Sequence, residues 1–323
     1  TLFAQLNSGK HPLITLKLLQ CAGSDITRPD FFELGKVAID DLLGELCLVP
    51  KRREIAQSKI DHTKIDAKAL YYNPSEEEQI SQLQSLLQPD RFERVCNRLT
   101  EKGMRRGFAT LFYGAPGTGK TETARQLARL TGRDIILVNI SELRDKYVGE
   151  SEKCVKALFD NYRKIVKEEA VAPILLFNEA DAIISKRSDS VTSSVDKMEN
   201  ALQNIILQEI EDLEGILIAT TNLTSNMDRA FERRFLYKVQ FNAPSIEAKC
   251  AIWHSMLPNL TCDEVKSLAT TYDFSGGQIE NIARKYTVAQ ILTDSDTLPF
   301  EKVQAMCNEE SLDKGPQRKA IGF

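Results

Sequence analysis

The segment GAPGTGKT, which runs from Gly114 to Thr121, constrains the fold of this chain more than any other stretch. It has the spacing of a phosphate-binding loop, in which glycines let backbone N–H groups turn inward around phosphate oxygens. A strand-like apolar run, ATLFY, precedes the segment, and a helical pattern follows it. A Gly-rich turn that arose by chance would lack this context, so we predict a P-loop that opens onto a helix N-terminus.

The chemistry of such a loop predicts ATP and Mg²⁺ as its ligands. Lys120 would place a positive charge near the β- and γ-phosphates, and the Thr121 hydroxyl would coordinate Mg²⁺. The predicted nucleotide-binding residues are those of the loop and its next neighbour, namely Gly114, Ala115, Pro116, Gly117, Thr118, Gly119, Lys120, Thr121 and Glu122.

The chain around the loop alternates between short strand-like runs and helical segments. The runs are ATLFY, DIILV, PILLF, GILIA and YKVQF, and the helical segments span residues 121–130, 150–167, 195–211 and 228–234. This alternation predicts an α/β fold, a P-loop NTPase with a doubly wound, parallel, five-stranded sheet and helices on both faces. After Pro244 the pattern is helical only, through about Glu309, which predicts a small all-α lid domain.

We therefore expect three parts along the chain. Residues 1–88 form a mostly helical N-terminal segment, either complete or part of a larger domain, residues 89–243 form the α/β core, and residues 244–323 form the helical lid. Within the first part, the polar stretch 51–66 is predicted to be a connector or an exposed helix. Asn73 is expected to open a helix, because the acidic residues that follow it suit the positive end of a helix dipole.

Composition narrows the class of protein. The net charge of −4 and the pI of about 5.7 argue against nucleic-acid binding, which usually leaves a basic footprint. No apolar run approaches the roughly 18 residues that a membrane span needs. The seven cysteines are scattered without a CxxC pair, as is typical of a reducing compartment. With no signal peptide visible, although the chain opens on Thr1 and could be a fragment, we expect a cytoplasmic protein with no membrane partner.

Four stretches follow one another along the chain: GAPGTGKT, DKYVGESEK, ILLFNEAD and ATTNLTSNMDRAFERRF. Their order and spacing resemble the AAA family within the AAA+ ATPases, over about residues 107–292, and specifically bacterial-type members of the protein-remodelling kind. The resemblance implies ATP hydrolysis in a ring of identical subunits, commonly a hexamer. It also implies that the ring remodels, unfolds or disassembles protein substrates, whose identity the sequence does not give.

The resemblance implies a role for each member of a catalytic set. Glu179 stands where the family's base polarises the attacking water, and Asn222 stands in the first-sensor position at the end of an apolar strand. A neutral amide there can hold the water or the γ-phosphate without adding charge. Arg233 and Arg234 stand where family arginines reach the γ-phosphate of the neighbouring subunit and neutralise its developing charge. Lys120 completes the set.

Two further positions follow from the resemblance. Tyr147, Val148 and Gly149 match the aromatic–hydrophobic–glycine loop that lines the central pore, where a Tyr ring can grip an extended polypeptide at low entropic cost. Alternatively, Tyr147 packs under its own loop. Gly277 lies in SGGQIENIARK, which resembles the start of the second-sensor helix, and its small size would let the backbone approach the adenine and ribose.

Asn178 departs from the family pattern, which has Asp at this position. Asparagine keeps a carbonyl oxygen of the same shape but loses a negative charge, and hard cations prefer carboxylate. With Thr121 and Asn178 as the predicted metal ligands, we expect weaker Mg²⁺ binding and slower turnover than an Asp would allow. The nearby Asp181 either compensates in part or pairs with a neighbour.

Three functions are consistent with these observations. The first is an ATP-driven machine that remodels proteins through a ring pore. The second is a nucleotide-gated scaffold or regulator that hydrolyses ATP weakly or not at all because of Asn178. The third is a nucleic-acid motor or clamp loader, which the acidic pI and the aromatic loop disfavour.

Overall fold

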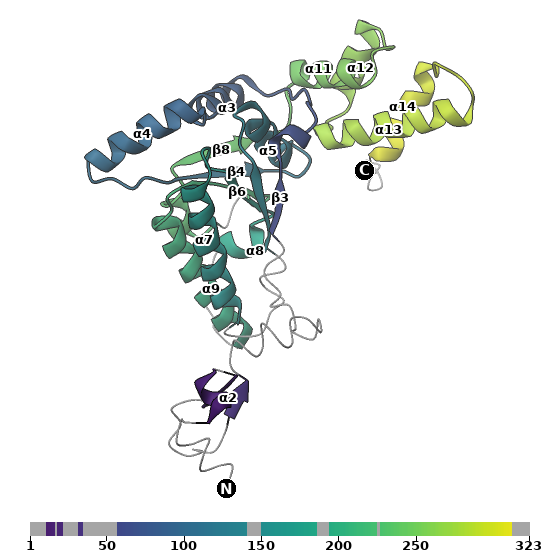
Figure 1. Ribbon diagram of the computed structural model, residues 1–323. Coiled ribbons are helices and arrows are strands. Elements are labelled where there is room, and N and C mark those ends of the chain that lie inside the picture. Colours follow the sequence, from purple (N-terminus) through teal and green to yellow (C-terminus); the bar gives the residue numbers. More distant parts are fainter. Residues whose placement is uncertain are drawn as a thin grey trace, which may run out of the picture. The chain divides into compact units, whose positions relative to one another are not determined.

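The computed structural model describes residues 11–16, 18–21, 32–34, 57–140, 150–185, 194–224 and 227–311 (Figure 1). The chain divides into two compact units, Thr1–Glu54 and Ile55–Phe323. In the first unit, the described residues form the short helix α2 (Pro12–Thr15) and an antiparallel pair of strands, β1 (Leu19–Cys21) and β2 (Phe32–Leu34). The prediction of a mostly helical N-terminal segment missed this strand pair.

The second unit is built around a six-stranded sheet with the order β3-β5-β6-β7-β4-β8. Five of its strands are the predicted parallel ones: β4 (Phe108–Gly114), β5 (Ile135–Asn139), β6 (Ile174–Asn178), β7 (Ile216–Thr221) and β8 (Tyr237–Phe241). Four of them, β4 to β7, are mostly buried apolar runs, as expected for strands covered on both faces, whereas the edge strand β8 alternates the exposed Lys238 and Gln240 with the buried Val239 and Phe241.

The sixth strand, β3 (Gln57–Ile60), was not predicted. It pairs antiparallel with β5 at one edge of the sheet, within the polar stretch that we expected to be a connector or a helix. The sequence QSKI has no apolar alternation, and the strand is held by backbone pairing and by Lys59, which forms ion pairs with Asp134 at 3.1 Å and Glu169 at 2.6 Å. Edge strands with a polar outer face carry little local sequence signal.

Helices cover both faces of the sheet (Figure 1). One face packs against α7 (Glu150–Glu168) and α9 (Ser194–Glu211), and the other against α3 (Pro74–Leu86), α4 (Pro89–Glu101) and α5 (Lys120–Leu130), each with its own buried apolar cluster. The short helices α8 (Asp181–Ile184) and α10 (Arg229–Glu232) follow β6 and β7. As predicted, Asn73 caps α3, and it forms a reciprocal capping box with Glu76.

The predicted lid is four helices with a separate core, shown from green to yellow in Figure 1. They are α11 (Ile246–Met256), α12 (Cys262–Thr271), α13 (Gly276–Leu292) and α14 (Phe300–Glu310). Trp253 of α11 is the largest fully buried side chain of this group, and Ser245, Thr261 and Ser275 cap three of the helices. The lid core is thus a separate apolar cluster from those of the sheet, and its first helix begins two residues after Pro244.

Candidate nucleotide-binding site

The predicted phosphate loop leaves β4 at Gly114 and enters α5 at Lys120. Gly114 has a φ of 144°, and a Cβ there would lie 2.0 Å from the carbonyl oxygen of Phe241 on β8. Gly119, which caps α5, has a φ of 92°. Glycine is therefore required at both ends of the loop by backbone conformation or close approach. The loop lies at the carboxyl edge of the parallel strands, where ligands of open α/β sheets bind.

Lys120 is folded back into the loop with only 7% of its surface exposed. Its Nζ donates to the carbonyl oxygens of Gly114 at 2.8 Å and Ala115 at 2.7 Å. Burial holds the pKa of Lys120 below its usual value, and the nearby Asp181 carboxylate acts in the opposite sense. The ammonium is thus preorganised inside the loop that would surround the phosphates.

The ends of β6 and β7 bring three oxygen-bearing side chains next to Thr121. Asn178 Oδ1 accepts hydrogen bonds from Thr121 Oγ1 at 2.7 Å and from Thr220 Oγ1 at 3.1 Å. The backbone N–H of Glu179 donates to Thr220 Oγ1 at 3.2 Å, and the Glu179 side chain is exposed toward the site. The two predicted metal ligands, Thr121 and Asn178, are therefore in direct contact, and the predicted base is the next residue.

Asp181 organises the first-sensor position. Its Oδ1 accepts a hydrogen bond from the Thr221 hydroxyl and another from the Asn222 backbone N–H at 2.9 Å. Of the two roles expected for Asp181, pairing with a neighbour is the one that the structure displays. These bonds orient the chain where β7 ends, so that Asn222 lies at the rim of the site.

One cavity of about 270 Å³ collects most of the predicted catalytic and phosphate-binding residues. It is lined by Pro116, Gly117, Gly119, Lys120, Thr121, Glu122, Glu179, Thr220, Thr221 and Asn222. The oxygen atoms around this cavity that could coordinate a metal belong to hydroxyl, amide and carboxylate groups, and Mg²⁺ prefers such oxygen ligands in proteins. The donor set therefore fits a hard divalent cation beside bound phosphates.

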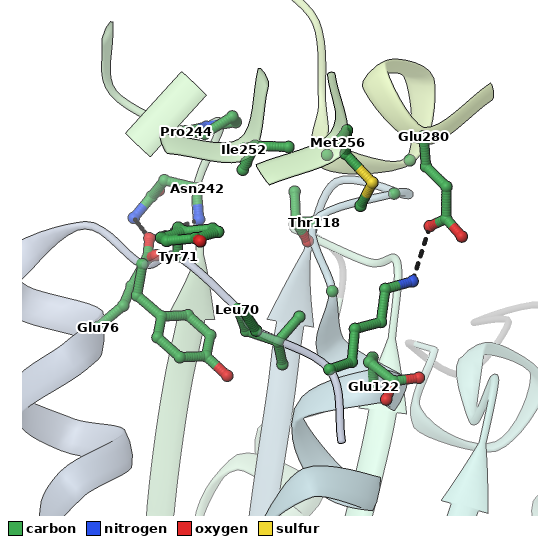
Figure 2. Close-up of a pocket in the computed structure, with 17 residues that line it drawn as sticks. Leu70, Tyr71, Glu76, Thr118, Glu122, Asn242, Pro244, Ile252, Met256 and Glu280 are labelled. Atoms are coloured by element: carbon green, nitrogen blue, oxygen red, sulfur yellow. Dashed lines mark hydrogen bonds and ion pairs between the residues drawn. The ribbon is translucent and has the colours of Figure 1, made fainter. Parts of the chain in front are cut away.

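A second cavity, of about 220 Å³, adjoins the first and shares Gly117, Gly119 and Glu122 with it. Figure 2 shows its wall of apolar and aromatic side chains, contributed by Leu70 and Tyr71 from the segment before α3 and by Ile252 and Met256 from the lid. An apolar slot next to a phosphate loop suits a nucleobase and ribose. Sequence reasoning missed these four residues, because only the run LYY at residues 70–72 hints at them and such a run is equally typical of a core.

The lid touches the phosphate loop through Gly277. The backbone N–H of Gly277 donates to the Gly117 carbonyl at 3.0 Å, and a Cβ on Gly277 would lie 3.2 Å from the Gly117 Cα. Across the second cavity, Lys68 Nζ and Glu280 Oε2 form an ion pair at 2.9 Å (Figure 2). The predicted close approach of Gly277 is therefore an approach to the loop that would hold the phosphates.

A buried carboxylate joins α3 to the hinge between core and lid. Glu76, with 5% exposure, accepts hydrogen bonds from the backbone N–H and side-chain amide of Asn242, at 2.8 and 3.1 Å. It also accepts from the backbone N–H and side-chain amide of Asn73, at 3.2 and 3.0 Å. Asn73 Oδ1 in turn accepts from the Ser245 N–H at 2.8 Å. Because Glu76 and Asn242 both line the second cavity, this network forms part of its wall (Figure 2).

The two predicted trans arginines differ in their surroundings. Arg234 Nη2 forms an ion pair with Glu211 at 2.6 Å, and Arg234 Nη1 donates to the Ala230 carbonyl at 2.9 Å. The Arg233 side chain is exposed and forms no ion pair with any residue that the structure describes. Neither lines the two cavities of its own chain. The predicted loop Tyr147, Val148 and Gly149 lies outside the described residues.

Within the described ranges, no helix is long and apolar enough to cross a membrane.

Comparison with known proteins agrees with the site. Residues 110–243 match the family model for the ATPase family associated with various cellular activities (AAA). The chain is 29% identical over 261 residues to the proteasome-activating nucleotidase of Methanosarcina mazei, an alignment that covers 75% of this chain and 58% of the relative. It is 33% identical over 218 residues to the 26S proteasome regulatory subunit 8 homolog of Schizosaccharomyces pombe, covering 62% of this chain and 50% of the relative.

A third relative extends the similarity along the chain. The ATPase family gene 2 protein of Saccharomyces cerevisiae is 27% identical over 300 residues, which cover 89% of this chain and 34% of that protein. The chain thus spans only part of each of these relatives, between about a third and three fifths of their length.

Proposed function

Since the chain belongs to the AAA family of ATPases, we propose that it binds ATP with Mg²⁺ and hydrolyses it to drive the remodelling of protein substrates. The observation that carries the proposal is the convergence of Lys120, Thr121, Glu179 and Asn222 on one cavity that continues into an apolar pocket. The four residues come from the phosphate loop and from the ends of two strands, β6 and β7, so their convergence is a property of the fold. It matches the needs of phosphoryl transfer to water.

In the proposed reaction a water oxygen attacks the γ-phosphorus and the bond to the β,γ-bridging oxygen breaks, which releases ADP and phosphate. Glu179 accepts the proton of the attacking water, and the Asn222 amide holds that water or the γ-phosphate in place. Lys120, released from the loop carbonyls, contacts the β- and γ-phosphate oxygens.

The metal site follows from the same geometry. When bound, Mg²⁺ supplies positive charge that stabilises the phosphate oxygens. Thr121 would bind it directly, and Asn178, the other predicted metal residue, would hold the Thr121 hydroxyl in place, with the phosphates and water as further ligands. The neutral amide of Asn178 lowers the negative charge of this set by one unit relative to Asp, so a higher Mg²⁺ requirement is part of the proposal.

We further propose that the active assembly is a ring of identical subunits, a hexamer, with ATP at the subunit interfaces. The exposed guanidinium of Arg233, which forms no ion pair with any residue that the structure describes, supports this, because an exposed cation outside its own cavity is available to a neighbouring subunit. Arg234, tied to Glu211, would orient that region, although both arginines remain part of the proposed catalytic set.

Protein is the proposed substrate class. The names of two relatives link them to the proteasome, and the loop Tyr147, Val148 and Gly149 would contact an unfolded polypeptide in the ring pore. Nucleic acid is not a proposed partner, given the net charge of −4. Within the described ranges, no disulfide joins Cys96, Cys154, Cys250, Cys262 or Cys307, which supports a reducing, cytoplasmic setting as part of the proposal.

The test is steady-state ATP hydrolysis against Mg²⁺ and protein concentration, for the parent, Glu179→Gln and Asn178→Asp. Turnover that rises cooperatively with protein concentration and disappears in Glu179→Gln supports the proposal. A parent that assembles with ATP but is silent at saturating Mg²⁺, while Asn178→Asp hydrolyses, would favour the nucleotide-gated scaffold. The neutral amide at Asn178 is the observation behind that second candidate.

A further inference from the structure

Thr220 lies at the carboxyl end of β7 with 2% of its surface exposed, and it contacts three consecutive residues of the neighbouring strand end. Its hydroxyl donates to Asn178 Oδ1 at 3.1 Å and accepts from the Glu179 N–H at 3.2 Å. Its carbonyl oxygen accepts from the Ala180 N–H at 2.8 Å. A hydroxyl has one proton and two lone pairs, so it can make both side-chain bonds at once.

These contacts surround Glu179, whose backbone conformation must be restrained by its neighbours. Glu179 has a φ of 54°, in the left-handed region that a residue with a Cβ rarely adopts. Thr220 binds the N–H groups of Glu179 and of the next residue, Ala180, so it holds the chain on both sides of the left-handed turn. A left-handed residue at a reactive position persists only where its surroundings determine it. Thr220 supplies that restraint and sets the direction in which the Glu179 side chain leaves the strand.

The hydrogen bonds to Asn178 define its role toward the metal. An amide oxygen has two lone pairs, and the hydroxyls of Thr121 and Thr220 occupy both. The Thr121 hydroxyl gives its proton to Asn178 and keeps its own lone pairs for a cation. Asn178 then orients Thr121 and has no free lone pair on Oδ1 for direct coordination.

We propose that Thr220 is a positioning residue that acts on both halves of the reaction centre. Through Asn178 it orients the metal ligand Thr121, and through backbone hydrogen bonds it orients Glu179. This rests on the proposed ATPase function of the same site. In a site with an Asp, the carboxylate has lone pairs to spare. In this chain the amide has none, so the hydroxyl of Thr220 determines how the amide is turned.

The test compares Thr220→Val, which keeps the shape and removes the hydroxyl, with Thr220→Ser, which keeps the hydroxyl. Thr110→Val is the matched control, because Thr110 is equally buried, at 1%, in the adjacent strand β4 and lines neither cavity. Thr220→Ala removes the hydroxyl with less volume and replaces Thr220→Val if that variant does not fold, as judged by thermal melting.

The first readout is the affinity for a fluorescent ADP analogue in Mg²⁺ and in excess EDTA. We expect Thr220→Val to leave binding in EDTA unchanged and to raise the Mg²⁺ concentration needed for tight binding about 10-fold, as for other residues that orient a metal ligand. Thr220→Ser and Thr110→Val should match the parent. The second readout is hydrolysis, where kcat should fall at least 10-fold in Thr220→Val with little change in KM for ATP.

A Thr220→Val variant that matches Thr220→Ser in both readouts would overturn the inference and leave the ATPase proposal intact. A parent that binds the analogue in a Mg²⁺-dependent way but never hydrolyses ATP would refute the ATPase proposal, while the Mg²⁺ titration still decides the role of Thr220. A parent that binds no nucleotide would overturn both.

Discussion

Replacing Glu76 by Gln should destabilise the protein and loosen the hinge between core and lid. The carboxylate of Glu76 accepts four hydrogen bonds from Asn73 and Asn242. Three of them end on Oε1, which the Gln carbonyl can replace. The fourth ends on Oε2, which would become an NH₂ group facing the Asn73 backbone N–H at 3.2 Å.

The magnitude follows from that substitution. One hydrogen bond to a charged acceptor contributes about 1.5–3 kcal/mol, and Glu76→Gln loses it and sets two donors against each other. The carboxylate also lies in the first turn of α3, where its charge contributes about 0.3–1 kcal/mol through the helix dipole. We therefore expect Glu76→Gln to lower the free energy of unfolding by about 2–4 kcal/mol.

Urea unfolding monitored by circular dichroism gives the free energy, and titration with a fluorescent ADP analogue reports the second cavity, whose wall includes Glu76. The matched control is Glu77→Gln, because Glu77 lies in the same first turn but is exposed. It should lose at most the dipole contribution. A Glu76→Gln protein within about 0.5 kcal/mol of Glu77→Gln would contradict the role assigned to the buried network.

Three further predictions concern the ring, the lid and the response to pH. Arg233→Ala and Glu179→Gln subunits should each be inactive alone, but a mixture should hydrolyse ATP, because one subunit supplies Glu179 and its neighbour supplies Arg233 at the same interface. A mixture without ATP hydrolysis would argue against a trans arginine. Gly277→Ala should weaken ATP binding several-fold without unfolding the protein, since its Cβ would lie 3.2 Å from the backbone of the phosphate loop. The control Gly276→Ala, whose Cβ would lie 3.6 Å from its nearest atom, should bind ATP as the parent does. Equal affinities of the two variants would refute the close approach. Burial raises the pKa of Tyr72 to about 12, with its hydrogen bond to Thr123 acting in the opposite sense, so the neutral phenol is favoured in the folded state. The contribution of the neutral phenol to the free energy of unfolding is fully present below the unfolded pKa of about 10 and is lost as pH rises through about 12. The urea midpoint of the parent should therefore fall more steeply than that of Tyr72→Phe between pH 9 and pH 12.

Much of the core could be read from the sequence because its signals are local. The five parallel strands lie within one or two residues of the predicted runs. In β4 to β7 these runs are continuous apolar segments, which a sheet buries on both faces whatever surrounds them. The phosphate loop could be recognised because its backbone requires glycine at fixed positions. At Gly114, for example, a Cβ would lie 2.0 Å from the carbonyl oxygen of Phe241. By contrast, the edge strand β3 has no such pattern and depends on its partner β5.

The candidate site likewise has some features that the sequence predicts and others that depend on the tertiary structure. The sequence by itself predicted that Lys120 and Thr121 bind phosphate and metal, because the spacing of their motif reflects loop geometry within a short stretch. The resemblance to the AAA family added Glu179 to the same reaction. Only the tertiary structure decided that Thr220, 42 residues from Asn178, holds Asn178, that Leu70 and lid residues share one pocket, and that Arg234 is paired with Glu211 while Arg233 is exposed. Such contacts join residues distant along the chain, and their geometry is set by how strands and helices pack, which no local pattern records.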